Sequence, residues 1–462
     1  MEEEPAILTL FEVQYSDLML LASDSTLDSS SDLSSAERQR LDSISSTIMK
    51  ALGPTGPGLL SIAGVPNSSI LRRKMLPLAR KLALLNHDDR KRILKEHRLG
   101  SDVPLKSLDR VVSSFAVKLE YSQGKDSLQN ERSPKGDLNA KLEQDFAAKG
   151  QDEFEDFGET LEQLGQVMVD LGIRLARVCD RAIGGQELEQ SLKESSTAKG
   201  RLIHYHSALD NLIMKENEAG RRKVTAKVRP KHDRKRGPCD PPASETWQLN
   251  TNQTEADLMT GQSNLWQQWH YDYGIFTILT DPLFISSCGS IQTSKERNGI
   301  APFDEHEVES PVGHTCLQVL DTYMDKQVSV KSSPESFIIQ VGESADILSK
   351  GKLRATLHWC FQAKKVGNVS RENFVVFLQP AWSKIFTPQN DSGSAQRFIV
   401  GDHGLSANDN TCRKQTTSKL VEDILNTIPP LSLRLKDGMT FAEFSRETTK
   451  QYYGGSGLQS NR

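Results

Sequence analysis

Residues 269–279 read WHYDYGIFTIL, and this stretch decides the fold and the chemistry that we expect. Its second half, residues 275–279, is a run of apolar and β-branched residues that predicts a buried strand. His270 and Asp272 lie just before that strand. Because side chains at positions i and i+2 of an extended segment point the same way, these two can face one metal ion at a sheet edge. An HxD pattern is common by chance, so its meaning depends on the rest of the chain.

A third metal ligand is predicted in residues 353–361, which read LRATLHWCF and indicate a second strand that contains His358. Two histidines and one carboxylate are the usual ligands of non-haem Fe(II), and they leave its other coordination positions open. A ligand from a distant strand suits a barrel, in which strands far apart in sequence line one lumen. The alternative for either histidine alone is a hydrogen-bonded core residue; the combination of His270, Asp272 and His358 favours the metal site.

Residues 371–377 read RENFVVF and predict another strand. Arg371 and Asn373 share one face of it. A guanidinium inside a barrel needs an anion, because burying the charge alone is costly. A carboxylate bound through two hydrogen bonds is the natural partner, and Asn373 could bind the same group. The alternative is a structural salt bridge from Arg371, for example to Glu343.

The two longest helical patterns lie before residue 200, and most of the predicted strands lie after it. Apolar residues recur at helical spacing in residues 70–96 and 154–182, and the second stretch ends at a Gly-Gly pair. We interpret both helices as scaffold. Short apolar segments predict further strands at residues 8–13, 59–62, 316–320 and 337–341, and two more helices are expected at residues 416–426 and 440–451.

Bulk composition limits the kinds of partner. The chain has 462 residues, 36% of them hydrophobic and 26% charged, with a net charge of -4, which is too small to indicate a nucleic-acid or membrane partner by itself. The acidic start lacks the features of a secretory signal, and no apolar run is long enough to span a bilayer. Six scattered cysteines suggest reduced thiols, so we expect a cytoplasmic protein, with a nuclear location as the alternative.

Two stretches, residues 216–244 and 286–314, look like insertions. The first carries a basic run at residues 221–236, which could be a nuclear import signal or a nucleic-acid patch. We favour a solvated loop, and we do not expect a nucleic-acid partner. A rival metal set exists in His204-x-His206, a spacing used by cupins. The expected glutamate is absent there, and Asp210 is the nearest carboxylate.

With these motifs together, the chain resembles the plant-type family of 2-oxoglutarate- and Fe(II)-dependent dioxygenases, related to isopenicillin N synthase. Residues 269–279 are similar to the family segment HTDxGxLTIL, residues 336–360 to GALVVNIGDxLQxxSNGxxKSxxHRV, and residues 371–377 to RxSxxxF. Residues 58–66 resemble the segment GFF…NHGVP, and residues 154–185 resemble the long helix before the barrel. The resemblance covers most of the chain.

The resemblance implies a role for each matching residue. The iron ligands, which are also the catalytic residues, would be His270, Asp272 and His358. Arg371 would bind the distal carboxylate of 2-oxoglutarate, and the further co-substrate-binding residues would be Asn373 and Tyr205. Residues 201–205, RLIHY, stand where the family has RxNYY. The chain departs from the family at Ile203, Trp359 and Asn373, where asparagine, arginine and serine are usual, but it keeps every ligand.

The function implied is hydroxylation or desaturation of a small organic metabolite, with Fe(II) as cofactor, 2-oxoglutarate and oxygen as co-substrates, and ascorbate as a supporting reductant. The alternative is a catalytically weak or inactive dioxygenase-like protein with a binding or regulatory role. A third possibility is an oxygenase that acts on protein or nucleic acid. We expect a monomer without a membrane partner.

The fold class expected is α+β, with a double-stranded β-helix (jelly-roll) core flanked by N-terminal and C-terminal helices. The boundaries that we predict are an N-terminal α/β region at residues 1–135, a long supporting helix and linker at 136–195, and the jelly-roll domain at 196–388. A polar loop, C-terminal helices and a disordered tail follow at residues 389–462.

Overall fold

The structure is a computed structural model that describes residues 6–23, 34–101, 103, 105, 111–121, 154–217, 269–288, 304–310, 316–321, 326–361, 368–387 and 419–453. The predictions for the basic run at residues 221–236, for the loop at 389–411 and for the tail at 454–462 lie outside these residues. Within the described part, no helix is both long and apolar enough to cross a bilayer.

The larger of two sheets contains ten strands among the described residues. Its main path runs through β2 (Glu12–Gln14), β3 (Leu59–Ala63), β12 (Phe337–Val341), β7 (Phe276–Thr280), β14 (Val369–Leu378), β6 (Thr197–Tyr205), β5 (Val112–Glu120) and β4 (Gly100–Ser101). From β14 the sheet also extends to β8 (Leu283–Cys288), which pairs with β9 (Asp304–Val308). Every residue of the central strands β7 and β12 is buried, as their unbroken apolar runs predict.

The smaller sheet has the order β1 (Ala6–Thr9), β11 (Lys326–Lys331), β10 (Cys316–Asp321) and β13 (His358–Phe361). Its inner face meets the inner face of the large sheet. Apolar side chains from both sheets form one cluster there, composed of Leu10, Leu59, Leu279, Leu317, Val319, Val328, Ile338 and Val375. The two sheets therefore enclose an apolar interior, which we call the cup, and the candidate metal ligands lie where the sheets are joined.

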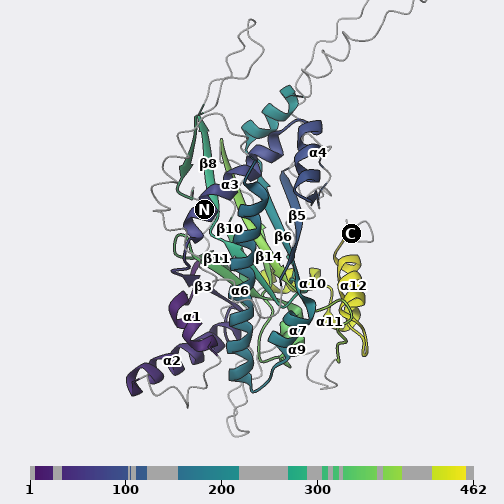
Figure 1. The fold of residues 1–462 in the computed structure, drawn as a ribbon. Helices are drawn as coiled ribbons and strands as arrows, with labels where there is room; N and C mark the ends of the chain where they lie inside the picture. Colours follow the sequence, from purple (N-terminus) through teal and green to yellow (C-terminus); the bar gives the residue numbers. More distant parts are fainter. Residues whose placement is uncertain are drawn as a thin grey trace, which may run out of the picture.

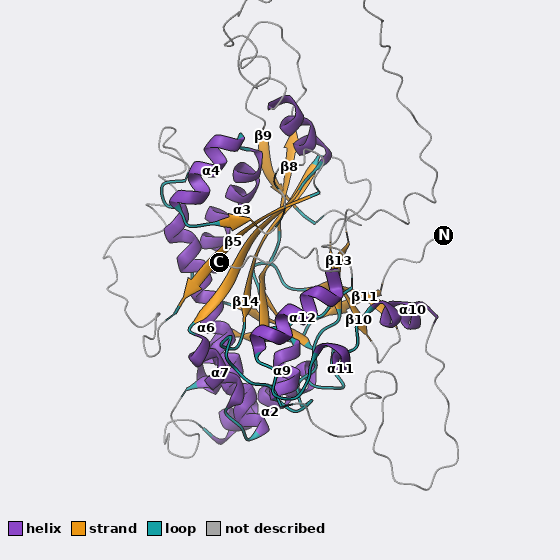
Figure 2. Cartoon of the chain, turned by 90° about the vertical axis from the view of Figure 1, so that its right-hand side faces the viewer, coloured by secondary structure: helices purple, strands orange, loops and turns teal. Residues whose placement is uncertain are grey.

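Helices cover the outside of the large sheet (Figure 1). The longest, α6 (Phe157–Ile183), packs with α3 (Ser68–Leu84) against β14. Around them lie α1 (Tyr15–Ala22), α2 (Ser35–Leu52), α4 (His87–Glu96) and α7 (Glu187–Ser195). A short helix, α9 (Glu343–Leu348), follows β12, and the C-terminal helices are α10 (Lys419–Thr427), α11 (Leu431–Arg434) and α12 (Phe441–Tyr453). Figure 2 shows α10, α11 and α12 on the side of the sheet opposite to α3 and α6.

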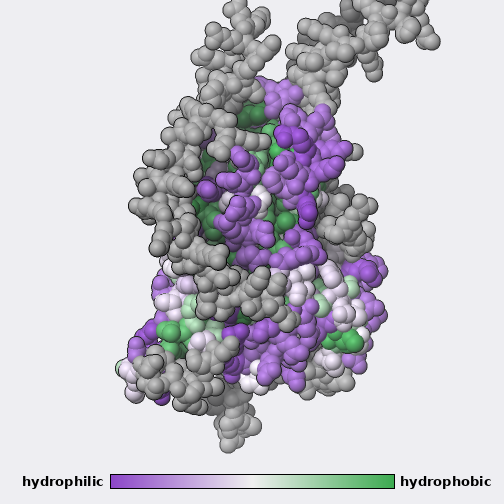
Figure 3. All heavy atoms as spheres, viewed as in Figure 1, coloured by the Kyte–Doolittle hydropathy of each residue, from purple (hydrophilic) through white to green (hydrophobic). Residues whose placement is uncertain are grey.

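The boundaries of α6 follow from its sequence. Its apolar stripe, which includes Leu164, Leu171 and Leu175, is fully buried. The helix stops at Gly184, whose φ of 78° is in the left-handed region that glycine adopts most readily. The Gly185 N–H donates to the Asp180 carbonyl at 2.9 Å and satisfies a free group at the helix end. On the outer face of this helical layer, hydrophilic residues cover most of the described surface (Figure 3).

The mixed helix and sheet architecture is confirmed, and so are the strands expected at residues 59–62, 275–279, 316–320 and 337–341. Other expectations were wrong in detail. Residues 8–13 contribute to two strands, β1 and β2, which belong to different sheets. In residues 353–361 only β13 is a strand, because the N–H groups of Arg354 and Thr356 donate instead to the carbonyls of Leu52 and Val341.

Residues 286–288 and 304–308, the described ends of the stretch that looked like an insertion, lie in strands. Strand β8 reaches Cys288, and β9 pairs with it from Asp304 onward, so the two form an antiparallel pair beside β14. The described part of this stretch therefore contains a strand, β9, that was not predicted, and its status as an insertion stays a prediction. The sequence of β9 is mostly charged and shows no apolar alternation, so it did not predict a strand. Exposed edge strands commonly carry charged side chains.

We predict that Gly172→Val destabilises the protein by about 1–3 kcal/mol, because α6 approaches the large sheet too closely for a larger side chain. A Cβ atom at Gly172 would overlap the Leu378 side chain and lie 3.1 Å from Ile278 Cδ1. Urea unfolding of both this variant and Gly185→Ala measures the effect; the alanine at Gly185 would meet nothing within 4 Å. Equal unfolding midpoints for the two variants would contradict the close approach.

Candidate metal centre

A pair of main-chain hydrogen bonds brings the two histidines together. The His270 N–H donates to the His358 carbonyl and the His358 N–H donates to the His270 carbonyl, both at 3.1 Å. The two residues form an isolated antiparallel bridge outside the named ladders. Side chains of directly opposed residues emerge on the same side of a ladder. The imidazole rings accordingly lie 4.5 Å apart between centroids, and both face Asp272.

The three predicted ligands converge within coordinating range. The ligand atoms of His270, Asp272 and His358 all lie within 4.8 Å of one another. His270 Nε2 is 3.8 Å from Asp272 Oδ1, and His358 Nε2 is 3.7 Å from Asp272 Oδ2. A transition metal with ligands at about 2.1 Å separates neighbouring ligand atoms by roughly 3 Å. Shifts of a few tenths of an ångström at each residue would therefore close the group around an ion.

Hydrogen bonds to the remaining polar atoms orient two of the ligands. His358 Nδ1 donates to the Thr356 carbonyl at 3.1 Å, which fixes the tautomer and leaves the lone pair on Nε2. Thr277 Oγ1 donates to Asp272 Oδ2 at 2.6 Å. Such outer partners are typical of metal sites, where they fix ligand orientation and raise affinity.

Asp272 is in the state that a cation requires. Burial raises the pKa of its carboxyl, but His358, His270 and the hydrogen bond from Thr277 together hold that pKa below its usual value. The carboxylate is therefore ionised at neutral pH. The His270 side chain is 25% exposed, against 9% for His358, so the site opens to solvent on the His270 side.

Two tryptophans lie beside the histidines in sequence and stack behind them. The rings of Trp269 and Trp359 have centroids 5.6 Å apart and an interplanar angle of 22°. Trp359 Nε1 also donates to Gln318 Oε1 at 2.6 Å, which ties the pair to β10. The stack therefore links the two segments that carry His270 and His358.

The predicted co-substrate residues lie on neighbouring strands β14 and β6. Arg371 stands directly opposite Tyr205 in the ladder, is 3% exposed, and has its Cζ atom 4.9 Å from the centre of the Tyr205 ring. Asn373, two positions along the same face, accepts a hydrogen bond from Thr280 Oγ1 at 2.6 Å. The structure brings Arg371 and Tyr205 together, while Asn373 is bound to the neighbouring strand.

Sequence reasoning gave no role to Arg201, which shares the cup face of β6 with Tyr205. Its Cζ atom lies 4.9 Å from the centre of the Phe377 ring on β14, and its charge contributes to lowering the pKa of Asp272. The signal was present in the sequence: Arg201 and Tyr205 are four residues apart on one strand, and even spacing places both on one face.

The suggested partner for Glu343 was wrong. Glu343 does not pair with Arg371 but with Arg434 of α11, whose Nη2 and Nη1 atoms donate to its two carboxylate oxygens at 2.6 and 2.7 Å. Both side chains are buried. The pair joins residues 91 positions apart, and no sequence pattern announces it.

The rival group is also assembled in the structure. The ligand atoms of His204, His206 and Asp210 lie within 4.8 Å of one another, so the nearest carboxylate in sequence does join the two histidines. His204 Nδ1, however, is 2.8 Å from Glu372 Oε2, and His206 Nε2 is 2.8 Å from Ser113 Oγ. His204, which points to the face of β6 opposite to Tyr205, is fully buried, and so is Asp210.

Asp210 already has a full set of donors. Its Oδ1 atom accepts from Arg80 Nε at 2.9 Å, and its Oδ2 atom accepts from Ser207 N at 2.7 Å and Ser207 Oγ at 2.8 Å. A buried carboxylate beside a guanidinium is neutralised without a metal ion. We therefore assign this group to a structural network beneath α3 and keep His270, Asp272 and His358 as the candidate metal centre.

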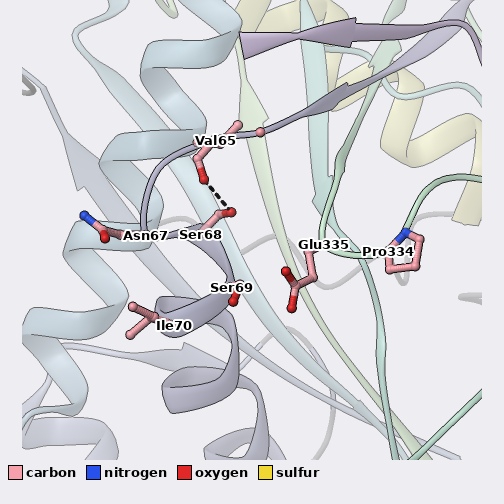
Figure 4. A pocket seen from close by; sticks show the side chains of 8 residues that line it. Val65, Asn67, Ser68, Ser69, Ile70, Pro334 and Glu335 are labelled. Carbon is pink, nitrogen blue, oxygen red and sulfur yellow. Dashed lines mark hydrogen bonds between the residues drawn. The ribbon is translucent and has the colours of Figure 1, made fainter. Parts of the chain in front are cut away.

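A surface cavity of about 250 Å³ lies elsewhere, at the start of α3 (Figure 4). Its lining includes Val65, Asn67, Ser68, Pro334 and Glu335. Among the described residues that line it there is no histidine and one carboxylate, and the Ser68 hydroxyl donates locally to the Val65 carbonyl at 2.8 Å. This cavity offers no metal-binding chemistry.

No family model matches the chain, and no curated protein matches it. Among solved structures, the chain is similar to a full-length Neurospora crassa protein in complex with alpha-KG and thymine, with 11% identity, a TM-score of 0.45 and coverage of 84% of this chain and 91% of that one. It is similar to JOX2 in complex with 2OG, Fe and JA (14% identity, TM-score 0.45, 96% and 86% covered). It is also similar to the rice dioxygenase for auxin oxidation (14% identity, TM-score 0.44, 85% and 89% covered).

We predict that Thr277→Val weakens metal binding about 10- to 100-fold, because it removes the hydrogen bond that orients Asp272. Thr277→Ser keeps the hydroxyl and is the matched control. Isothermal titration with Co²⁺ in place of Fe(II) measures both variants without oxidation of the ion. Equal affinity in the valine and serine variants would show that Thr277 does not orient the carboxylate.

Proposed function

We propose that this protein is an Fe(II)- and 2-oxoglutarate-dependent oxygenase that hydroxylates or desaturates a small organic metabolite. The observation that carries the proposal is the convergence of His270, Asp272 and His358, contributed by two segments far apart in the chain and ordered as the ligand set of non-haem iron requires. We further propose that the two facing sheets form a double-stranded β-helix and that the jelly-roll domain spans residues 196–388, between the regions at 1–135, 136–195 and 389–462.

The roles of the ligands follow from their protonation. Metal binding requires a lone pair on each imidazole and an ionised carboxylate. The Nδ1–H bond of His358 to the Thr356 carbonyl leaves Nε2 for the metal, and the hydrogen bond from Thr277 Oγ1 stabilises the ionised form of Asp272. Bound Fe(II) would supply oxygen activation and oxidation of the substrate C–H bond, while the protein provides position and exclusion of water. The apolar side chains that line the cup suit the exclusion of water.

Arg371 is the proposed anchor for the carboxylate of 2-oxoglutarate that is distant from the metal. A guanidinium presents two parallel donors that match a carboxylate, and its charge remains at every physiological pH. The Tyr205 ring packs beside the guanidinium, with its centre 4.9 Å from Arg371 Cζ, and a side chain that is already packed loses less entropy on binding. The carboxylate would supply a negative charge beside a cation that is almost completely buried.

The direct test is binding and turnover with purified protein. We expect 2-oxoglutarate to bind the Fe(II)-loaded protein in anaerobic calorimetry, and succinate to form when oxygen and ascorbate are added. His358→Ala should abolish both signals while leaving the thermal unfolding midpoint near that of the unaltered protein, because the bridge uses main-chain atoms. Absence of 2-oxoglutarate binding to the Fe(II)-loaded, unaltered protein would refute the proposal.

We predict that Arg371→Met raises the KM for 2-oxoglutarate by roughly 10- to 100-fold, the equivalent of about 1.5–3 kcal/mol for hydrogen bonds to a charged group. Arg371→Lys keeps the charge but not the paired donors, so its KM for 2-oxoglutarate should lie between those of the unaltered protein and the methionine variant. Succinate release at varied 2-oxoglutarate concentration measures the change. An unaltered KM in the methionine variant would remove Arg371 from the co-substrate site.

A further inference from the structure

The segment that carries Asp272 is not itself part of a sheet ladder. Instead, successive N–H groups at the start of α9 hold its carbonyl groups. The N–H groups of Gly342, Glu343 and Ser344 donate to the carbonyls of Ile275, Asp272 and Gly274 at 2.9, 2.8 and 3.0 Å. Ser344 Oγ adds a bond to the Tyr273 carbonyl at 2.5 Å. The position of the Asp272 main chain therefore depends on where the start of α9 lies.

The start of α9 is in turn fixed from the C-terminal end of the chain. The Glu343 carboxylate is 4% exposed and receives both terminal nitrogens of Arg434. Arg434 is 1% exposed, and its Nε atom donates to the Pro429 carbonyl at 2.9 Å. Its Cζ atom lies 5.9 Å from the centre of the Phe444 ring and 5.4 Å from the centre of the Tyr452 ring. The Arg434 side chain is thus held by contacts with α12 and with the residues before α11, in addition to its pair with Glu343.

A second contact joins α12 to the same segment. The Tyr271 N–H donates to the Tyr452 hydroxyl at 3.3 Å, one residue from Asp272. Tyr452 therefore contacts both the segment and Arg434. The two contacts reach the segment from α12 directly and from α11 through α9, so the C-terminal helices constrain it at two points.

General stability does not explain why this pair is charged. A buried ion pair is on average no more stabilising than well-packed apolar residues of similar volume, because desolvation offsets the attraction between the charges. What the charged pair adds is direction: two parallel hydrogen bonds fix the distance and the angle between α11 and Glu343. A fixed position of α9 matters for metal binding, because Asp272 must hold an ion to within a few tenths of an ångström.

We propose that Arg434 is a positioning residue for the metal centre: acting through Glu343, it makes the docked C-terminal helices α11 and α12 a required part of the site that binds the ion. This inference rests on the proposed metal-binding function. Neither Arg434 nor Glu343 belongs to the group of residues that would hold the ion. The C-terminal helices can therefore set metal affinity without contributing a ligand.

The test compares metal affinity with stability in four variants of the full-length protein. Arg434→Met breaks the pair, Arg434→Lys keeps the charge without the paired donors, and the double variant E343M/R434M replaces the pair by apolar side chains. Lys384→Met is the matched control, since it breaks the exposed Lys384–Glu187 pair of 2.8 Å. Co²⁺ titration without 2-oxoglutarate measures affinity, and thermal unfolding measures stability.

We expect E343M/R434M to bind Co²⁺ at least tenfold more weakly than the unaltered protein while unfolding at a similar temperature, with Arg434→Lys between them and Lys384→Met unchanged. If Arg434→Met does not fold, the double variant still decides. Affinity equal to that of the unaltered protein in the double variant would overturn the positioning role, and any weakening in Arg434→Met would then reflect only an unpaired carboxylate. Absence of Co²⁺ binding by the unaltered protein would instead overturn the proposed metal site.

Discussion

The reciprocal main-chain hydrogen bonds between His270 and His358 are the constraint on which the rest of the site depends. His270 leads into β7 of the large sheet, whereas His358 begins β13 of the small sheet. The bridge is therefore a point at which the two sheets are joined, and the metal ligands stand on that joint. Because the bonds involve backbone atoms alone, the paired imidazoles are placed by the fold and not by their own chemistry.

The third ligand depends on a different kind of support. Asp272 lies in a short extended segment whose carbonyls are bound by N–H groups at the start of α9. Its carboxylate is almost buried, and it stays ionised because two imidazoles and the Thr277 hydroxyl offset the cost of burial. The site thus combines a rigid half, built from paired strands, with a half held by a chain of contacts that reaches the C-terminal helices. The paired strands fix the register of the two histidines, and the segment before β7 supplies the negative charge of Asp272.

Much of this arrangement could be predicted from local pattern. The alternation in WHYDYG placed His270 and Asp272 on one side, and the runs of apolar residues gave the central strands and the long helix. Placing His358 beside the other two ligands required the assumption that strands far apart in sequence line one interior. The two facing sheets agree with that assumption. The contacts between distant side chains could not be predicted. Nothing near Glu343 in sequence specifies Arg434, and nothing near Asp210 specifies Arg80, because a single chain carries no signal for pairs set by tertiary packing.

The stacked tryptophans next to the two histidines give the protein an intrinsic fluorescence probe of metal binding. Trp269 and Trp359 are covalent neighbours of the two histidine ligands, and their indole rings are in contact. An ion with unpaired electrons held by those histidines would be only a few bonds from both chromophores and would dim their emission. Metal occupancy of the site can therefore be followed by tryptophan fluorescence, in dilute solution and without a label.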